Sequence, residues 1–178
     1  MEGNHWDIAE GGFYHASQKH TALPIKSRTI EDDATPNANS VMIKNYNNLY
    51  HLTGNDGYKI KAEKIAEAFA AAAASNPFAA PGLLKNALVL QDTIQLVLTN
   101  DANPAQNELL LLALRYTGLD AAIHVTGANP NLTQNHPAYG KTANNSKPTL
   151  YICRGMTRAN PATDTAETLA SLRLLGIA

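Results

Sequence analysis

The side chains best suited to chemistry lie in one acid- and amide-rich segment, residues 31–40, just before a patterned stretch that predicts a helix. The segment carries carboxylates at Glu31, Asp32 and Asp33 and carboxamides at Asn37 and Asn39. Neighbouring carboxylates repel each other, and this can raise the pKa of one of them toward a value useful for acid–base catalysis. The alternative is structural, because an acid before a helix commonly accepts hydrogen bonds from the amides of the first turn.

Loop residues near the N-terminus are further candidates. Trp6 lies beside Asp7, and an aromatic ring beside a carboxylate can stack on a sugar or a base. The alternative is that Trp6 and Phe13 fill the end of a helical bundle. His15 follows a Gly-Gly-Phe-Tyr turn and is a candidate acid–base residue, although loop histidines are commonly solvated. No two histidines have the His-x-x-x-His spacing of a metal site, and we predict neither a metal nor a cofactor.

Cys153 is the single cysteine, so the chain can form neither an internal disulfide nor a Cys-x-x-Cys pair. The charge of the adjacent Arg154 can lower a thiol pKa, which makes Cys153 a candidate redox residue. A lone cysteine at the end of an apolar strand is more commonly a small buried hydrophobe, and that alternative stays open. The sequence contains no phosphate-binding glycine loop, nucleophile elbow or zinc motif.

The composition is that of a folded globular protein, with 44% hydrophobic and 16% charged residues among 178. A formal net charge of -1 leaves no basic surplus to neutralise phosphates, which argues against a nucleic-acid partner. No run reaches the roughly 18–20 apolar residues that a membrane span requires, and the first residues lack the features of a signal peptide. We therefore expect a soluble, cytoplasmic protein.

Hydrophobic periodicity predicts three helices in the first half of the chain, at residues 38–52, 58–74 and 80–90. The residues expected to be buried are Ala38, Val41, Met42, Tyr46, Leu49 and Leu52 in the first helix, Ala62, Ile65, Ala66, Phe69 and Ala73 in the second, and Leu83, Leu84, Ala87 and Leu88 in the third. The four turn residues 54–57, with Asp56 as a helix cap, predict an antiparallel helical hairpin. Residues 11–15 and 23–25 could form a small β-hairpin closed by residues 17–19.

The second half alternates between strands and helices. Strands are expected at residues 94–99, 121–126 and 149–153, and helices from Asn103 to residue 116 and from Asp164 to residue 175. Residues 127–148 form a long loop. The fold class is therefore α+β, with helical hairpins in residues 1–92 and a small three-stranded α/β lobe in residues 93–178. Three helices are too few to bury their own apolar faces, so the lobe, a second copy or another polypeptide must cover them.

Several motifs occur in an order that resembles one family. They are Asp7-x-x-x-Gly11-Gly12-Phe13-Tyr14, Asp32-Asp33-Ala34-x-Pro36-Asn37-x-Asn39-Ser40, Leu52-Thr53-Gly54, Lys141-Thr142 and Thr149-Leu150-Tyr151-Ile152-Cys153-Arg154. Together they cover nearly the whole chain. The sequence resembles the C-terminal part of the spermatogenesis-associated protein 20 family, called YyaL-like in bacteria, whose members are thioredoxin-domain-containing proteins.

The resemblance implies a larger architecture. Full-length members carry an N-terminal thioredoxin-like domain, then a helical toroid similar to N-acylglucosamine 2-epimerases and six-hairpin glycosidases, and then a small α/β tail. This chain would correspond to the last toroid hairpins and the tail. The thioredoxin domain with its Cys-x-x-Cys is absent from this sequence, so no dithiol activity is carried over to it. Arg158 stands where the family often has a second cysteine, which weakens a disulfide or metal role for Cys153.

Loops at one end of such toroids line a central cavity, and sugar-acting members use carboxylates there as acid and base. The residues this implies are Asp32, Asp33 and His15 for catalysis and Trp6, Asp7, Phe13, Asn37, Asn39 and Ser40 for ligand binding. A glycosidase needs two carboxylates roughly 5 Å or 6.5–9.5 Å apart, and the region offers Glu2, Asp7 and Glu10 as partners. We expect a non-catalytic structural or interaction module that joins the remainder of a toroid or a second copy. The alternative is a site for a carbohydrate-like small molecule, linked to carbohydrate metabolism.

Overall fold

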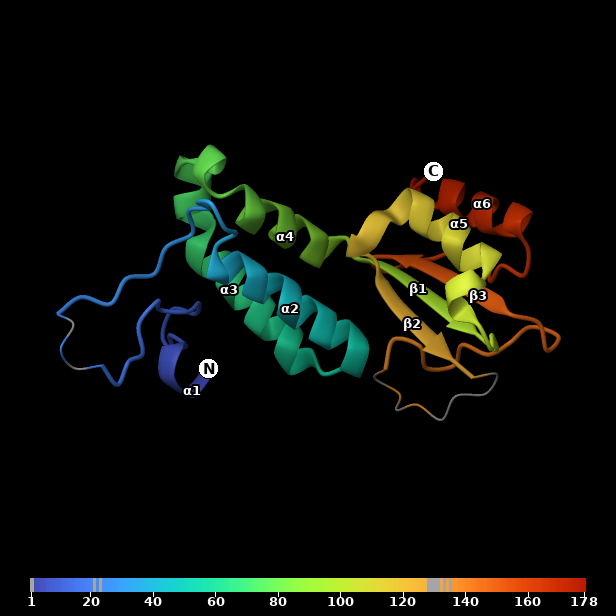
Figure 1. The fold of residues 1–178 in the computed structure, drawn as a ribbon, viewed down its shortest axis with the longest axis horizontal. Coiled ribbons are helices and arrows are strands. Elements are labelled where there is room, and N and C mark those ends of the chain that lie inside the picture. Colours follow the sequence, from blue (N-terminus) through green and yellow to red (C-terminus); the bar gives the residue numbers. More distant parts are fainter. Residues whose placement is uncertain (1, 21, 23, 128–131, 133, 135) are drawn as a thin grey trace. The chain divides into compact units, whose positions relative to one another are not determined.

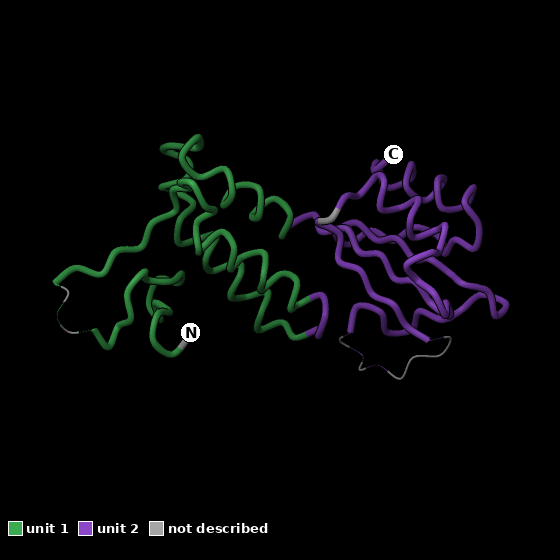
Figure 2. The backbone as a smooth tube through the Cα atoms, in the orientation of Figure 1, with its two compact units in different colours: residues 1–50, 55–90 green, residues 51–54, 91–178 purple. Residues whose placement is uncertain are grey.

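A computed structural model describes residues 2–20, 22, 24–127, 132, 134 and 136–178. The chain divides into two compact units (Figure 2). Unit 1 comprises residues 1–50 and 55–90, and unit 2 comprises residues 51–54 and 91–178. The predicted fold class is confirmed: the chain is α+β, with a helical hairpin followed by a small lobe that contains a sheet (Figure 1).

Helices dominate unit 1. A short helix α1 (Glu2–His5) precedes a long irregular segment, and α2 (Ala38–Thr53), α3 (Asp56–Ser75) and α4 (Pro81–Gln91) follow, with a 3-10 turn η1 (Pro77–Ala79) between the last two. The predicted hairpin of α2 and α3 is confirmed, but its cap is Asn55, whose side chain accepts the Gly57 N–H at 2.9 Å. Asp56 is instead the first residue of α3.

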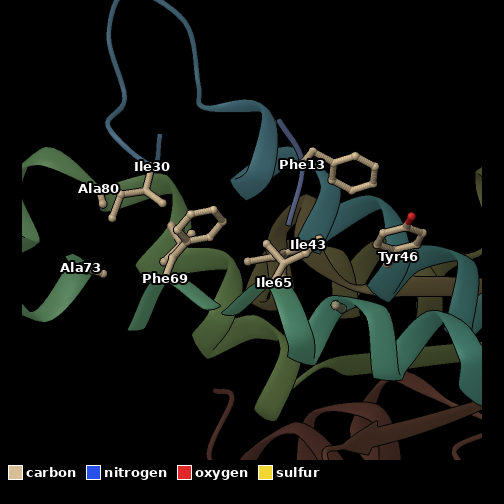
Figure 3. Close-up of a cluster of buried hydrophobic side chains, with 10 residues drawn as sticks. Phe13, Ile30, Ile43, Tyr46, Ile65, Phe69, Ala73 and Ala80 are labelled. Atoms are coloured by element: carbon tan, nitrogen blue, oxygen red, sulfur yellow. The ribbon is translucent and has the colours of Figure 1, made fainter. Parts of the chain in front are cut away.

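The core of unit 1 forms between α2, α3 and the N-terminal loop. Its buried residues are Phe13, Ile30, Ile43, Tyr46, Ala62, Ile65, Phe69, Ala73, Ala80 and Leu83. Figure 3 shows Ile43 of α2 beside Ile65 of α3, with Phe69 and Tyr46 on either side of this pair. The predicted buried face of α3 is largely confirmed, because Ala62, Ile65, Phe69 and Ala73 are buried and Ala66 is half-buried.

The predicted buried face of α2 is largely wrong. Among the apolar residues expected inside, Val41 is 40% and Leu52 is 56% exposed, and Ala38 and Leu49 are exposed as well. The buried side chains of this helix are mostly polar: Asn39, Ser40, Ile43, Tyr46, Asn47 and His51. Asn39 and Ser40 face inward because their side chains form hydrogen bonds there. The spacing of apolar residues does not reveal such hydrogen bonds, so it predicted the wrong side of α2.

Unit 2 contains a four-stranded sheet in the order β2-β1-β3-β4. Strand β1 (Ile94–Thr99) is parallel to β2 (Ala122–Thr126) and antiparallel to β3 (Thr149–Arg154), and β3 pairs with the two-residue strand β4 (Thr157–Arg158). The fourth strand was not expected, because two residues carry no readable alternation. Helices α5 (Glu108–Thr117) and α6 (Thr165–Leu174) pack on one face of the sheet (Figure 1).

Helix caps explain how the helices of unit 2 begin. The predicted cap of α6 is confirmed, since Asp164 accepts the Glu167 N–H at 2.8 Å. The helix expected from Asn103 is divided into a 3-10 turn η2 (Pro104–Gln106) and α5, with another short turn η3 (Gly118–Asp120) after it. Asn107, not Asn103, caps α5, and its side chain accepts the Leu110 N–H at 3.0 Å.

The hairpin expected near the N-terminus is wrong. Phe13 forms an antiparallel bridge with Trp6, and residues 24 and 25 are not in a strand; Leu23 lies outside the described residues. The aromatic ring of Phe13 stabilises this pairing, because it contacts the Trp6 ring edge-on at a centroid distance of 5.1 Å. Within the described residues, none of the helices combines the length and apolarity that spanning a bilayer requires.

Candidate functional site

The N-terminal loop reaches the helices through two glycines. Gly11 and Gly12 have φ angles of 81° and 83°, a left-handed conformation that glycine adopts without strain. A Cβ atom on Gly12 would lie 2.8 Å from the Phe69 ring, and one on Gly11 would lie 3.0 Å from the carbonyl oxygen of Lys64. The two glycines therefore permit the close approach to α3 that places Phe13 in the core.

Asp7 is buried at the centre of this loop. Its Oδ1 accepts the N–H groups of Ala9 at 2.9 Å and Glu10 at 3.2 Å. Its Oδ2 accepts the Tyr14 hydroxyl at 2.7 Å and lies 3.0 Å from the Arg28 guanidinium. Both carboxylate oxygens are thus engaged by neighbouring groups of the same unit.

These contacts hold Asp7 ionised. Burial by itself raises its pKa, but the hydrogen bonds from Tyr14, Glu10 and Ala9 together with the Arg28 charge outweigh burial, and the net pKa is lowered. The hydrogen bond to Asp7 raises the pKa of Tyr14, because the carboxylate favours the protonated phenol. A carboxylate with a lowered pKa is a poor general acid near neutral pH. Asp7 therefore fits a structural role better than proton donation.

Arg28 is a site residue that the sequence analysis missed. It pairs with Asp7 and Glu10 and donates to the Gly11 carbonyl at 2.5 Å. Its guanidinium also lies over the rings of Tyr14 and Phe69, at 5.3 and 5.6 Å from their centroids. Arg28 is the single arginine in residues 1–92. This is the one feature of the sequence that could have identified it as a site residue.

Asn39 joins the loop to α2. It is 1% exposed, and its side chain pairs with the Phe13 backbone: Oδ1 accepts the Phe13 N–H at 2.7 Å and Nδ2 donates to the Phe13 carbonyl at 3.1 Å. Asn37 caps the helix, since its Oδ1 accepts the Asn39 N–H at 2.7 Å. The Ser40 hydroxyl donates to the Asn37 carbonyl at 2.8 Å. The predicted ligand-binding residues Phe13, Asn37, Asn39 and Ser40 are thus brought together and bind one another.

Asp32 joins the acid-rich segment to α4. Its Oδ1 accepts the Asn37 N–H at 2.7 Å, and its Oδ2 accepts the Gly82 N–H in the first turn of α4 at 2.6 Å. A Cβ atom on Gly82 would lie 2.8 Å from that Oδ2, so the glycine leaves room for the bond. Asp32 therefore acts as a helix cap supplied from a distant segment, which was the structural alternative for this residue.

The other predicted catalytic residues lie in different surroundings. Asp33 is exposed, and its backbone N–H donates to the Thr35 carbonyl at 3.3 Å. His15 is also exposed, and its Nε2 lies 2.8 Å from the Thr29 hydroxyl. The Thr29 carbonyl accepts the side-chain amide of Asn37, which links His15 to the helix cap. Their assignment to catalysis stays a prediction.

An open hollow of about 610 Å³ lies on unit 1 beside the Asp7 loop. Its lining combines acid, phenol, amide and ammonium groups with apolar side chains: Asp7, Ile8, Ala9, Tyr14, Gln18, Pro24 and Lys26. Trp6 and Phe13 are not in this lining, so the aromatic rings expected to stack on a ligand belong to the core.

Cys153 lies buried in β3, and burial raises the pKa of its thiol. A raised pKa disfavours the thiolate, which is the reactive form of cysteine. The structure therefore gives no support to a redox role for Cys153. The described residues contain no group of three His, Cys, Asp or Glu side chains that could hold a metal ion.

The fold defines an α+β protein in which a helical hairpin unit accompanies a small four-stranded lobe.

The chain is similar to spermatogenesis-associated protein 20 of Rattus norvegicus, with 30% identity over 108 residues, which is 60% of this chain and 14% of the relative. It is 24% identical to the Homo sapiens protein of that name over 168 residues, 91% of this chain and 21% of the relative. The Mus musculus protein is 29% identical over 108 residues.

The chain thus spans about a fifth or less of the length of the curated relatives it matches. No protein-family model matches the chain. What these comparisons establish is a distant relationship to spermatogenesis-associated protein 20.

The role of Asp32 as a cap predicts its effect on stability. Asp32→Ala should lower the free energy of unfolding by about 1–3 kcal/mol, because it removes two hydrogen bonds to backbone N–H groups, one of them at the start of α4. Asp33→Ala, the matched control at an exposed acid, should change it by less than about 0.5 kcal/mol. Urea unfolding at neutral pH measures both. Equal effects of the two substitutions would contradict the cap.

His124 in β2 predicts a pH dependence. Burial lowers its pKa from 6.5 to about 4, and the charges of His136, His51 and Lys141 lower it in the same direction. Between these values the unfolded chain binds more protons than the folded chain, so stability should fall as the pH drops from 6.5 to 4. The loss should be on the order of 2 kcal/mol.

His124→Gln should reduce this pH dependence, and His20→Gln, at an exposed histidine, should leave it unchanged. Denaturant unfolding at a series of pH values provides the measurement. Parallel pH profiles for wild type and His124→Gln would refute the assignment.

Proposed function

We propose that this chain is a non-catalytic structural and interaction module, the C-terminal portion of a protein related to spermatogenesis-associated protein 20. In this proposal the helical unit is part of a larger toroid of helical hairpins, completed by other segments of such a protein or by a second copy. The thioredoxin-like domain of the family would lie outside this sequence.

One observation carries the non-catalytic part: three polar side chains of the acid–amide segment, Asp32, Asn37 and Asn39, are engaged in hydrogen bonds with backbone groups of the same unit. Asp32 accepts two N–H groups, Asn39 pairs with Phe13, and Asn37 caps α2. A catalytic acid or base must reach a substrate proton at hydrogen-bond distance. Side chains held by several internal bonds support the fold and leave little freedom for that contact.

Exposed apolar side chains on α2 support the interaction part. Val41 and Leu52 lie eleven positions apart, which is three helical turns, so they share one face of the helix. Their exposed fractions are 40% and 56%, whereas Ile43 and Tyr46 on the inward side of the same helix are almost completely buried. Covering them would contribute roughly 25 cal/mol for each Å² of apolar area removed from water.

The interaction proposal predicts self-association when the chain is studied alone. Its molar mass by size-exclusion chromatography with light scattering should rise with protein concentration. The double substitution Val41→Glu and Leu52→Glu should return it to a monomer, because a carboxylate cannot be buried unpaired at an apolar contact. Ala71→Glu adds the same charge on exposed α3 surface and should preserve the association. A wild-type monomer at all concentrations, with little binding of a hydrophobic dye, would contradict the proposal.

A second candidate is a carbohydrate-like ligand in the open hollow on unit 1. The observation in its favour is the mixture of hydrogen-bonding groups in the lining, with Asp7, Tyr14, Gln18 and Lys26 beside the apolar Ile8. Such a mixture suits a polyhydroxylated molecule, which needs both donors and acceptors. Asp7 would not protonate such a ligand, because its pKa is lowered and both of its carboxylate oxygens are engaged within the unit.

The second candidate predicts that a sugar raises the melting temperature. A screen of mono- and disaccharides against wild type, Lys26→Met and Asp33→Asn tests this. Loss of the shift in Lys26→Met but not in Asp33→Asn places the ligand in the hollow, which Lys26 lines and Asp33 does not. Loss of the shift in Asp33→Asn alone indicates that the ligand binds at the adjacent carboxylates of Asp32 and Asp33. A wild type that responds to no sugar would exclude both placements.

A further inference from the structure

A small hollow of about 230 Å³ lies on unit 2, between α6 and the segment that follows β4. We call it the α6 hollow, and the function proposed above does not use it. Its lining combines polar and apolar residues of these two elements: Asn160, Pro161, Glu167, Ala170, Ser171 and Leu174. Drug-sized ligands occupy pockets of roughly 300–1,000 Å³, so the α6 hollow suits a single short chain of atoms.

The first wall of the α6 hollow is the segment after β4, which the sheet holds in place. Ala159 and Ala162 both form backbone hydrogen bonds with β3, at distances of 2.8 to 3.1 Å. Between these two residues, the Asn160 carbonyl accepts the hydroxyl of the buried Ser171 at 3.2 Å. The segment is therefore fixed both to β3 and to α6.

One face of α6 forms the second wall. Four lining residues have the i, i+3, i+4, i+7 spacing that puts side chains on the same side of a helix: Glu167, Ala170, Ser171 and Leu174. Leu174 is 72% exposed. Together with Ala170 it gives the C-terminal end of this wall an apolar surface, which gains free energy when a ligand covers it.

The Glu167 carboxylate lies at the other end of this face and is held in one orientation. Its Oε2 accepts the Thr163 N–H at 2.7 Å and the Thr163 hydroxyl at 3.0 Å. Its Oε1 forms no hydrogen bond within the described residues, and Glu167 takes part in no ion pair there. A carboxylate that is already fixed loses little conformational entropy when a ligand binds to it.

The charged groups at this end of the α6 hollow are acidic. No Lys, Arg or His is found among the described residues of the lining. Asp164, the cap of α6, adds a second carboxylate in the same helical turn as Glu167. Two full negative charges outweigh the partial charge of about +0.5 at a helix N-terminus. This end of the hollow therefore attracts a cation.

We propose that the α6 hollow binds an aliphatic cation, an ammonium or guanidinium group on an apolar stem. The charged head lies at Glu167, and the stem runs along Ala170 and Leu174, which follow at intervals of about one helical turn. Both a lysine or arginine side chain of a partner polypeptide and a free alkylamine have this chemistry. The site lies in unit 2 and is independent of the function proposed above.

NMR titration of the whole, isotope-labelled chain tests the proposal. The chlorides of n-pentylammonium and n-butylguanidinium and the neutral n-pentanol are added separately at constant ionic strength and neutral pH. At least one of the two cations should cause saturable amide shifts confined to residues 159–175, with millimolar affinity because an exposed ion pair contributes little. It should bind roughly two- to fivefold more tightly than n-pentanol. A wild type without saturable shifts, or with no preference for a cation, would overturn the site.

Glu167→Gln tests the charged end. Glutamine also serves at this position of a capping box, so the substitution removes the charge and preserves the start of α6. In this variant the cation should bind no more tightly than n-pentanol. Glu108→Gln, at an exposed acid in the first turn of α5, is the matched control and should keep the preference of the wild type. A preference that persists in Glu167→Gln would refute the role of this carboxylate.

Leu174→Ala tests the apolar end. It should weaken the binding of both the cation and n-pentanol roughly threefold, because both lose contact area with the leucine. Leu111→Ala, at a leucine of α5 that is 44% exposed, should leave both affinities unchanged. Equal effects of the two substitutions would contradict the placement of the stem.

Nα-acetyl-lysine amide distinguishes the two sources of the cation, because it carries the alkylammonium stem between two peptide groups. Binding at least as tight as that of n-pentylammonium identifies a side chain of a partner polypeptide as the occupant. Binding of n-pentylammonium without binding of the lysine derivative identifies a free alkylamine.

Discussion

The pairing of the Asn39 side chain with the Phe13 backbone is the interaction on which the rest of unit 1 depends. A carboxamide offers one donor and one acceptor in the geometry of a peptide group, so Asn39 extends the backbone pairing of the loop into α2. Each such hydrogen bond contributes about 0.5–1.5 kcal/mol net to the free energy of unfolding. Removing one partner costs more, because the buried donor or acceptor that remains has no hydrogen bond. Removing the amide would therefore affect the loop, the helix start and the core position of Phe13 together.

This arrangement has a consequence for the outer side of the helix. Because Asn39 and Ser40 must face inward to make their hydrogen bonds, α2 turns Val41 and Leu52 outward. An apolar surface of this kind is what a hairpin inside a larger helical assembly would present to the next helix. The hydrogen bonds of residues 31–40 therefore do two things. They hold the loop on α2, and they leave exposed the apolar side chains on which the proposed interaction role depends.

In unit 2 the apolar and polar side chains are divided between the two faces of the sheet. Its helix-covered face is an ordinary apolar core built on Leu96, Leu98, Leu150 and Ile152, and its other face buries Lys141 and His124 without an acid. The polar side chains of unit 1 thus hold its loop and helices together, whereas unit 2 buries Lys141 and His124 in its small lobe.

The sequence alone determined the features that depend on near neighbours. Helices α2 to α6, the three main strands, most of the buried face of α3 and the cap at Asp164 follow from periodicity and from contacts within about four residues. Only the tertiary structure decided the roles of Asp32 and Asn39, since their partners Gly82 and Phe13 lie 50 and 26 positions away. It also decided which face of α2 is buried. The physical reason is that a polar side chain has no preferred side until a distant partner supplies its hydrogen bond.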